Sequence, residues 1–183
     1  MNGTRNNNLI VIENGQLRTY MLDDKLEWEV GRPSKENKPD IKLYSATVSR
    51  QHGRFQNMDG VWFYLDYYGK NGTVLNNKHL EAGMQGRKRP VMLKDGDIFI
   101  FGGGMEAVIN SKTIWAWYST KYYGEEWRMV VSRNEGDVLF SDGESETTLR
   151  NPPKGTIVEK ERGLAIYMGN VTYLLGEMCV NGR

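Results

Sequence analysis

Short runs in which apolar and polar residues alternate, separated by turn residues, cover most of the chain. Asn14-Gly15 lies between two such runs near the N-terminus, and Asp59-Gly60 lies between two more. An Asn-Gly or Asp-Gly pair between apolar runs is a strong signal of a β-hairpin. With no convincing amphipathic helix, the pattern predicts an all-β sandwich or barrel. Other strand-like runs occupy residues 26–31, 40–45, 72–77, 89–104 and 105–110.

A similar succession of strand and turn signals starts again at Ile114. Residues 114–142 can be laid over residues 9–45, and Ser132-Arg133 then falls on Gly31-Arg32. This match predicts a second, related β unit, although two unrelated β segments can align equally well.

The repeat suggests where the units begin and end. We expect a flexible tail at residues 1–7, a first β unit at residues 8–111 and a second at residues 112–183. The second unit has no counterparts for the last strands of the first, so we expect it to be truncated and to leave a sheet edge unpaired.

Composition narrows the class of protein. Of 183 residues, 39% are hydrophobic and 26% charged, which is typical of a globular protein. The net charge of +1 gives no overall attraction to nucleic acid or to an anionic membrane. A single cysteine excludes a disulfide framework and a cysteine metal site. The polar N-terminus is no signal peptide, so we expect a cytoplasmic location without membrane contact, and neither metal nor cofactor.

Basic and polar side chains gather where the predicted strands end. Gly31-Arg32 closes one strand, Ser49-Arg50-Gln51-His52 precedes the next, and Asn71-Gly72-Thr73 follows a third. The loops of a β-sandwich can meet at one end of the fold. Two guanidinium groups, a hydroxyl and an amide, with no carboxylate among them, would form an anion site there.

Other readings of these motifs are weaker. Ser49 and His52 could form a nucleophile and its base, but Asp66 is the only nearby acid and nothing indicates an oxyanion hole. The glycines at residues 102–104 are not followed by Gly-Lys-Ser/Thr, so they form no phosphate loop. The basic cluster at residues 86–90 has no interleaved aromatic residues, which favours a solvated loop over a nucleic-acid site. We therefore expect no enzyme and no nucleic-acid partner.

The ordered combination of "GR", "SRQH", "NGT" and "LKDGDIFIFG" resembles the forkhead-associated (FHA) domain, a reader of phosphothreonine peptides. The resemblance covers about residues 8–111. It implies an eleven-stranded β-sandwich that holds the phosphopeptide in loops at one end. A phosphothreonine-bearing partner and a Ser/Thr kinase pathway are therefore implied as well.

The resemblance also assigns roles to single residues. Arg32 and Ser49 would hold the phosphate, and Arg50 would add to that cradle or contact the residues that flank the phosphothreonine. Asn71 would bind the ligand backbone. The family often has serine where this chain has Gly69, so one hydroxyl is missing and Lys70 is a candidate to replace it. Gly31, His52, Gly72 and Thr73 would be structural residues that shape the loops.

The second unit lacks the Ser-Arg-x-His quartet, since its corresponding segment reads "TTLRNPPKG". We therefore interpret the chain as an FHA-type β-sandwich followed by a degenerate FHA-like β unit. This domain order is similar to that of the cytosolic head of the membrane-anchored FtsK/SpoIIIE-like ATPases of type VII secretion. Two alternatives stay open: a scaffold that binds no phosphate, and a module that reads its own chain at Thr4.

Overall fold

The computed structural model describes residues 6–103, 114–122, 126–131 and 136–183. The chain divides into two compact units, Met1–Tyr123 and Gly124–Arg183. The described residues are strands, turns and two 3₁₀ turns, so the all-β prediction is confirmed. The strand expected at residues 105–110 lies outside the described residues.

The first unit contains a six-stranded sheet with the order β2-β1-β11-β10-β7-β8, in which all pairings are antiparallel. The bounds of its strands are β1 Asn8–Glu13, β2 Gln16–Met21, β7 Thr73–Leu75, β8 Lys78–His79, β10 Ile98–Phe101 and β11 Ile114–Ser119.

The other sheet of the first unit has five strands in the order β4-β3-β5-β6-β9, and only β3 and β4 pair in parallel. Its strands are β3 Glu27–Gly31, β4 Ile41–Lys42, β5 Gly53–Met58, β6 Val61–Asp66 and β9 Val91–Met92. The 3₁₀ turns are η1 Leu22–Asp24 and η2 Met84–Gly86.

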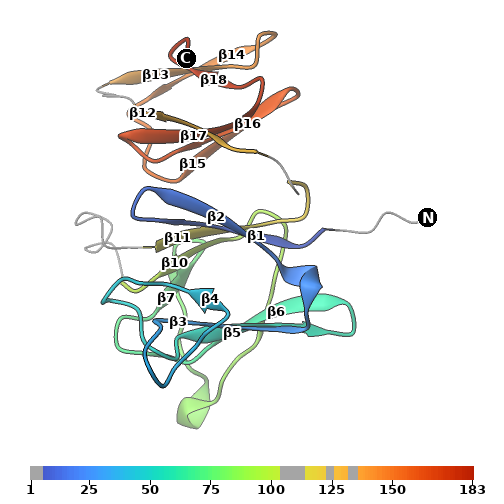
Figure 1. The fold of residues 1–183 in the computed structure, drawn as a ribbon, viewed down its shortest axis with the longest axis vertical. Helices are drawn as coiled ribbons and strands as arrows, with labels where there is room; N and C mark the ends of the chain where they lie inside the picture. The colour runs from blue at the N-terminus through green and yellow to red at the C-terminus, as the bar shows by residue number, and fades with distance from the viewer. Residues whose placement is uncertain (1–5, 104–113, 123–125, 132–135) are drawn as a thin grey trace. The chain divides into compact units, whose positions relative to one another are not determined.

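The two sheets form two layers, one with β1, β2, β10 and β11 and the other with β3, β5 and β6 (Figure 1). Side chains from both sheets point into a shared core, where the rings of Phe55 and Tyr64 lie 4.9 Å apart and those of Tyr64 and Phe99 lie 5.1 Å apart. Burial of each such side chain contributes about 1.5–3 kcal/mol. This core fixes the strand ends from which the loops extend.

Both predicted hairpin turns are present. Asn14 and Gly15 join β1 to β2 with φ of 50° and 75°, and Asp59 and Gly60 join β5 to β6 with φ of 54° and 85°. Positive φ at both central residues is the geometry of a type I′ turn, which matches the twist of paired strands.

The boundary expected after residue 111 is wrong, because β11 belongs to the first unit. This strand lies between β1 and β10, with Trp117 opposite both Ile10 and Ile98. Without β11 those two strands would be unpaired edges in the middle of the sheet. The tail expected at residues 1–7 is also too long, since the backbone of Asn7 bonds the Asp23 carboxylate and the Leu22 N–H, each at 2.8 Å.

The second unit has two sheets of its own, with the orders β12-β17-β16-β15 and β14-β13-β18. Val138, Phe140, Ala165, Leu174 and Met178 form much of its core. The bounds are β12 Arg128–Val131, β13 Asp137–Ser141, β14 Glu146–Arg150, β15 Thr156–Lys160, β16 Gly163–Tyr167, β17 Val171–Gly176 and β18 Cys179–Val180. The proposed kinship of this unit with the first stays a prediction.

Candidate functional site

Three loops of the first unit are joined by hydrogen bonds. They are the β3–β4 loop (residues 32–40), the β4–β5 loop (residues 43–52) and the β6–β7 loop (residues 67–72). The backbone N–H of Arg32 donates to the Ser49 carbonyl, and its Nε donates to the carbonyl of Val48, both at 3.1 Å. The Asn71 side-chain amide donates to the Thr47 carbonyl at 2.9 Å. Arg32, Ser49 and Asn71, far apart in the sequence, are thereby brought together.

Two glycines allow this close approach. A Cβ at Gly31 would lie 1.9 Å from the carbonyl oxygen of Arg50, so only glycine lets the end of β3 contact the β4–β5 loop. A Cβ at Gly69 would lie 2.1 Å from the Ser49 hydroxyl oxygen. A side chain at residue 69 would therefore displace the hydroxyl of Ser49.

His52 fixes the β4–β5 loop from within the core and is 1% exposed. Its Nδ1 accepts a hydrogen bond from the Ser49 backbone N–H at 3.1 Å, so the proton of the neutral ring is on Nε2. Nε2 faces the Gly72 carbonyl at 3.1 Å and the Thr73 hydroxyl at 2.9 Å. Both ring nitrogens are therefore engaged away from the Ser49 hydroxyl, and the two residues form no nucleophile–base pair.

A buried polar network continues beneath this histidine. The hydroxyls of Thr73 and Tyr64 donate to Asp66 Oδ1 at 2.6 and 2.7 Å. Burial lowers the pKa of His52, and the nearby Asp66 charge only partly offsets that effect. Burial also raises the pKa of Tyr64 well above its usual value. His52 is therefore neutral and Tyr64 protonated at neutral pH, as their hydrogen bonds require.

Asn37 was not anticipated as a site residue. Its side-chain amide donates to the carbonyl oxygens of Arg50 at 2.5 Å and Arg32 at 3.1 Å, which ties the middle of the β3–β4 loop to the other loop. Ser34 closes the turn, since its hydroxyl accepts from the Asn37 N–H at 3.1 Å. The Ser-x-x-Asn spacing is a turn signal, but it does not reveal which distant carbonyls the amide reaches.

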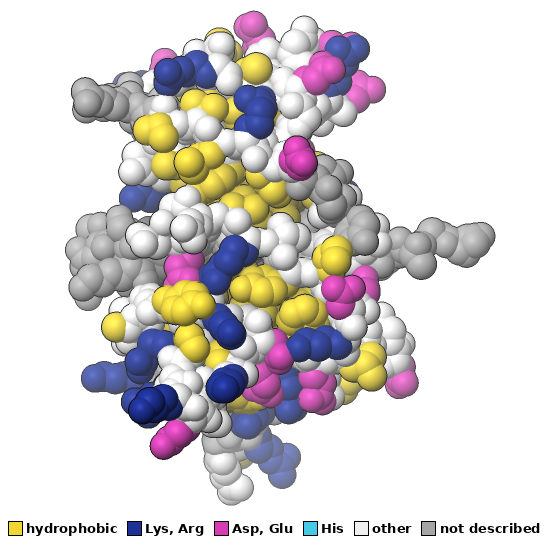
Figure 2. Space-filling view, viewed as in Figure 1, with side chains coloured by type: hydrophobic (Ala, Val, Ile, Leu, Met, Phe, Trp, Pro, Cys, Tyr) yellow, Lys and Arg dark blue, Asp and Glu magenta, His cyan; other side chains and the backbone are white. Residues whose placement is uncertain are grey.

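The side chains presented by these loops are positively charged or neutral. Within the described part of the chain, no ion pair joins Arg32, Arg50 or Lys70 to an acid, and the Ser49 hydroxyl has no hydrogen-bond partner. Arg32 and Ser49 are half-buried, whereas Arg50 and Lys70 are exposed. Lys and Arg side chains gather around the loops beside β3, β4 and β5 (Figure 2). Unpaired donors of this kind suit an oxyanion.

Two absences hold for the described residues. No group of three His, Cys, Asp or Glu side chains among them is arranged to hold a metal ion. None of the helices in the described ranges is long and apolar enough to cross a membrane.

Residues 28–102 match the family model of the FHA domain, so the chain contains one FHA domain. The structure of full-length yeast Pml1p has a TM-score of 0.50 and 22% identity, and the alignment covers 62% of this chain and 81% of that one. A second structure of the yeast Pml1 splicing factor has a TM-score of 0.51 and 21% identity, covering 66% and 85%.

A further solved structure comes from a study of phosphothreonine-dependent FHA domain interactions, with a TM-score of 0.45, 20% identity and coverage of 63% and 99%. No curated protein matches the chain. The FHA β-sandwich predicted for the first unit is confirmed, and the matched residues 28–102 all lie within that unit.

Proposed function

We propose that the first unit binds phosphothreonine-bearing segments of partner proteins and so mediates phosphorylation-dependent protein–protein interaction. Arg32 and Ser49 hold the phosphate, and Asn71 binds the ligand backbone. Lys70 adds positive charge where the family often has a hydroxyl nearby, and Arg50 faces the residues that flank the phosphothreonine. The match of residues 28–102 to the FHA domain supports this assignment.

The observation that carries the proposal is the pair of hydrogen bonds from Arg32 to the β4–β5 loop. They hold its guanidinium beside the segment that bears the Ser49 hydroxyl, with no acid paired to either residue. A phosphothreonine offers a charge of about −1.5 to −2 and three strong acceptor oxygens to such donors. Each charge-assisted hydrogen bond contributes about 1.5–3 kcal/mol.

Phosphorylation acts as a switch at such a site. An unmodified threonine would leave the guanidinium and the hydroxyl unpaired after their water is displaced, which opposes binding. Discrimination of threonine from serine rests on one methyl group, whose burial contributes about 0.8 kcal/mol, so close packing has to supply any stronger preference.

The test is a titration of the whole chain with a fluorescent, degenerate phosphothreonine peptide library and with its unphosphorylated twin. We expect only the phosphorylated library to bind. Arg32→Ala and Ser49→Ala should each weaken its binding about tenfold to a hundredfold. Arg150→Ala, at an exposed arginine of the second unit, is the matched control. Equal binding of both libraries would reject the proposal and favour a scaffold that binds no phosphate.

The wider context is a separate proposal. The loose repeat and the absent Ser-Arg-x-His quartet support a degenerate FHA-like role for residues 124–183 in structure or assembly. The domain order supports a place in a larger protein similar to the type VII secretion ATPases, with a cytoplasmic Ser/Thr kinase that phosphorylates the partner. A full gene that encodes transmembrane helices and P-loops downstream would support this context, and a gene without them would reject it.

A further inference from the structure

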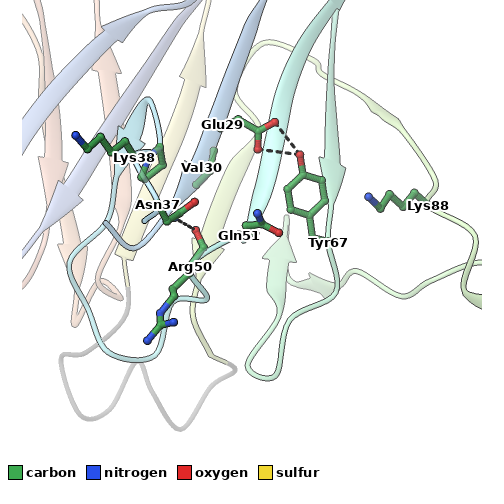
Figure 3. Close-up of a pocket in the computed structure, with 9 residues that line it drawn as sticks. Glu29, Val30, Asn37, Lys38, Arg50, Gln51, Tyr67 and Lys88 are labelled. Atoms are coloured by element: carbon green, nitrogen blue, oxygen red, sulfur yellow. Dashed lines mark hydrogen bonds between the residues drawn. The ribbon is translucent and has the colours of Figure 1, made fainter. Parts of the chain in front are cut away.

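A pocket of about 550 Å³ lies directly beside the segment that carries Ser49 (Figure 3). Arg50 and Gln51, the residues between Ser49 and His52, form part of its wall. A smaller hollow of about 370 Å³ shares Asn37 and these two residues. The larger pocket is lined by Glu29, Val30, Asn37, Lys38, Pro39, Arg50, Gln51, Tyr67 and Lys88.

The single acid of the pocket already has partners. The Tyr67 hydroxyl donates to the Glu29 carboxylate and lies 2.9 Å from each of its oxygens (Figure 3). Arg54 Nη1 lies 3.8 Å from the same carboxylate. Burial, reinforced by the hydrogen bond to Glu29, raises the pKa of Tyr67 to about 12, so this hydroxyl keeps its proton at neutral pH. The charge of Glu29 is thereby partly offset by Arg54 from within the protein.

The three cations of the lining are not offset in this way. Within the described residues, Lys38, Arg50 and Lys88 form no ion pair with an acid. The ammonium of Lys88 lies 4.3 Å from the centre of the Tyr67 ring, which orients it without neutralising it. Three positive groups against one acid give the pocket a net positive charge, which favours an anionic occupant.

The pocket lies within reach of a peptide held at Ser49. Ser49 and Gln51 are two residues apart, so their Cα atoms are separated by at most about 7 Å. An extended ligand covers that distance in about two residues. The Asn37 amide ties the β3–β4 loop to the Arg50 carbonyl, so the side of the pocket that adjoins the segment bearing Ser49 is held in place before any ligand arrives.

We propose that this pocket binds the carboxylate of an aspartate or glutamate that lies close to the phosphothreonine in the ligand. Lys88 supplies the charge, and the Gln51 amide supplies a neutral donor (Figure 3). This inference rests on the proposed function, and it adds a preference for acidic sequence context that the phosphate site alone would not give.

The test uses alanine-based peptides with a central phosphothreonine and a single glutamate placed at each neighbouring position in turn. Each peptide is titrated by fluorescence anisotropy against the whole chain, beside the same peptides with glutamine or lysine. We expect one position at which glutamate binds about threefold to tenfold more tightly than glutamine. We expect this preference to shrink at high salt.

Variants locate the source of the preference. Lys88→Gln should abolish the difference between glutamate and glutamine while it leaves the affinity of the glutamine peptide unchanged. Glu29→Gln should enlarge the difference, because the pocket loses its acid. Lys94→Gln, at an exposed lysine outside the pocket lining, should change neither.

Two results would overturn the inference while leaving phosphothreonine recognition intact. One is the absence of a glutamate preference at every position, and the other is a preference that survives in Lys88→Gln. A preference for lysine would overturn it too and would indicate that Glu29 contacts the flanking side chain of the ligand. Failure of every phosphorylated peptide to bind better than its unphosphorylated twin would reject the proposed function and this inference with it.

Discussion

The Nδ1 atom of buried His52 accepts a hydrogen bond from the backbone N–H of Ser49 at 3.1 Å. The residue proposed to bind phosphate is therefore positioned by a side chain that cannot contact the ligand. Since Nε2 of the same ring bonds Thr73, the histidine joins the β4–β5 loop to the start of β7. Loop geometry thus depends on the protonation state of one ring.

Acidification is expected to disrupt this link. Burial lowers the pKa of His52 in the folded protein, so the folded state binds the proton less readily than the unfolded state, in which the pKa is about 6.5. The contribution of His52 to stability is therefore complete above that value and falls as the pH drops below it. We expect the melting temperature to fall between pH 7.5 and pH 5.5 and Ser49 amide exchange to accelerate, as measured by calorimetry and hydrogen exchange.

The two histidines of the chain allow a matched comparison. His52→Asn should lose about 1–3 kcal/mol of stability at pH 7.5, because a buried hydrogen-bond network is broken, and should show little further loss on acidification. His79→Gln removes an exposed ring and should keep the pH dependence of the unmodified protein. Equal pH dependence in His52→Asn and the unmodified chain would contradict the assignment.

The close contact between Gly69 and Ser49 gives a second prediction. An alanine Cβ at residue 69 would lie 2.1 Å from the Ser49 hydroxyl oxygen, so that side chain has to rotate out of the site. We expect Gly69→Ala to weaken the binding of phosphothreonine peptides about tenfold to a hundredfold, which is the loss expected for Ser49→Ala. Calorimetric titration measures this loss. The double variant should be no weaker than either single variant, because both remove the same hydroxyl.

A small change in melting temperature is expected for Gly69→Ala, since the atom that has to move is the end of a side chain that can rotate. Binding equal to that of the unmodified chain would show that the Ser49 hydroxyl is not used. The same experiment with Gly69→Ser asks whether the serine common in the family can be restored here, and we expect that it cannot.

The sequence predicts those features of the fold that depend on nearby residues. Asn14-Gly15 and Asp59-Gly60 identify their hairpins because positive φ at both turn positions is a local property. In contrast, Trp117 lies in a continuous apolar run that would suit any sheet, and only long-range pairing with Ile10 and Ile98 assigns β11 to the first unit. The misplaced boundary follows from this, because a strand-like apolar run says nothing about which strand is its neighbour.

At the candidate site too, the sequence does not reveal contacts between residues that are far apart in the chain. The spacing of Arg32, Ser49 and Asn71 identified three loops that the fold brings together. Asn37 could not be found in that way, because its amide donates to the Arg50 carbonyl, which is distant in the sequence. Glu13 could not be found either, because its carboxylate accepts hydrogen bonds from the distant backbone N–H groups of Tyr44 and Ser45. Neither residue differs in type from ordinary loop and strand-end residues, so only the coordinates reveal their contacts.

Glu13, at the end of β1, provides a third prediction. Its Oε2 accepts hydrogen bonds from the backbone N–H groups of Tyr44 at 2.7 Å and Ser45 at 3.1 Å, and its Oε1 bonds Arg18 at 2.8 Å. Glu13→Ala leaves these donors without their acceptor, and we expect a loss of about 1–3 kcal/mol in stability. Amide exchange at Tyr44 and Ser45 should accelerate, and phosphothreonine peptides should bind more weakly because the loop that carries Ser49 is less ordered.

Glu81→Ala is the control for this effect, since Glu81 is exposed and forms no ion pair among the described residues. It removes the same charge without touching the β4–β5 loop. If Glu13→Ala and Glu81→Ala bind the peptide equally well, the loop does not depend on its anchor at the end of β1.

The last prediction concerns Asp142, which connects two turns of the second unit. Its Oδ1 accepts from the backbone N–H groups of Ser145 at 2.9 Å and Glu144 at 3.0 Å, and its Oδ2 accepts from that of Arg162 at 3.1 Å. The hydrogen bonds from Ser145 and Glu144 lower the pKa of Asp142 to about 2. Its contribution to stability is therefore present above about pH 4 and is lost as the pH falls toward 2.

Hydrogen exchange in β13 and β16 measures this contribution directly. We expect exchange there to accelerate in Asp142→Ala at pH 7, because three backbone donors lose their acceptor, and to change less between pH 5 and pH 3 than in the unmodified chain. Asp137→Ala, at the exposed aspartate that begins β13, should keep the acid response. An unchanged acid response in Asp142→Ala would show that another carboxylate governs the acid stability of this unit.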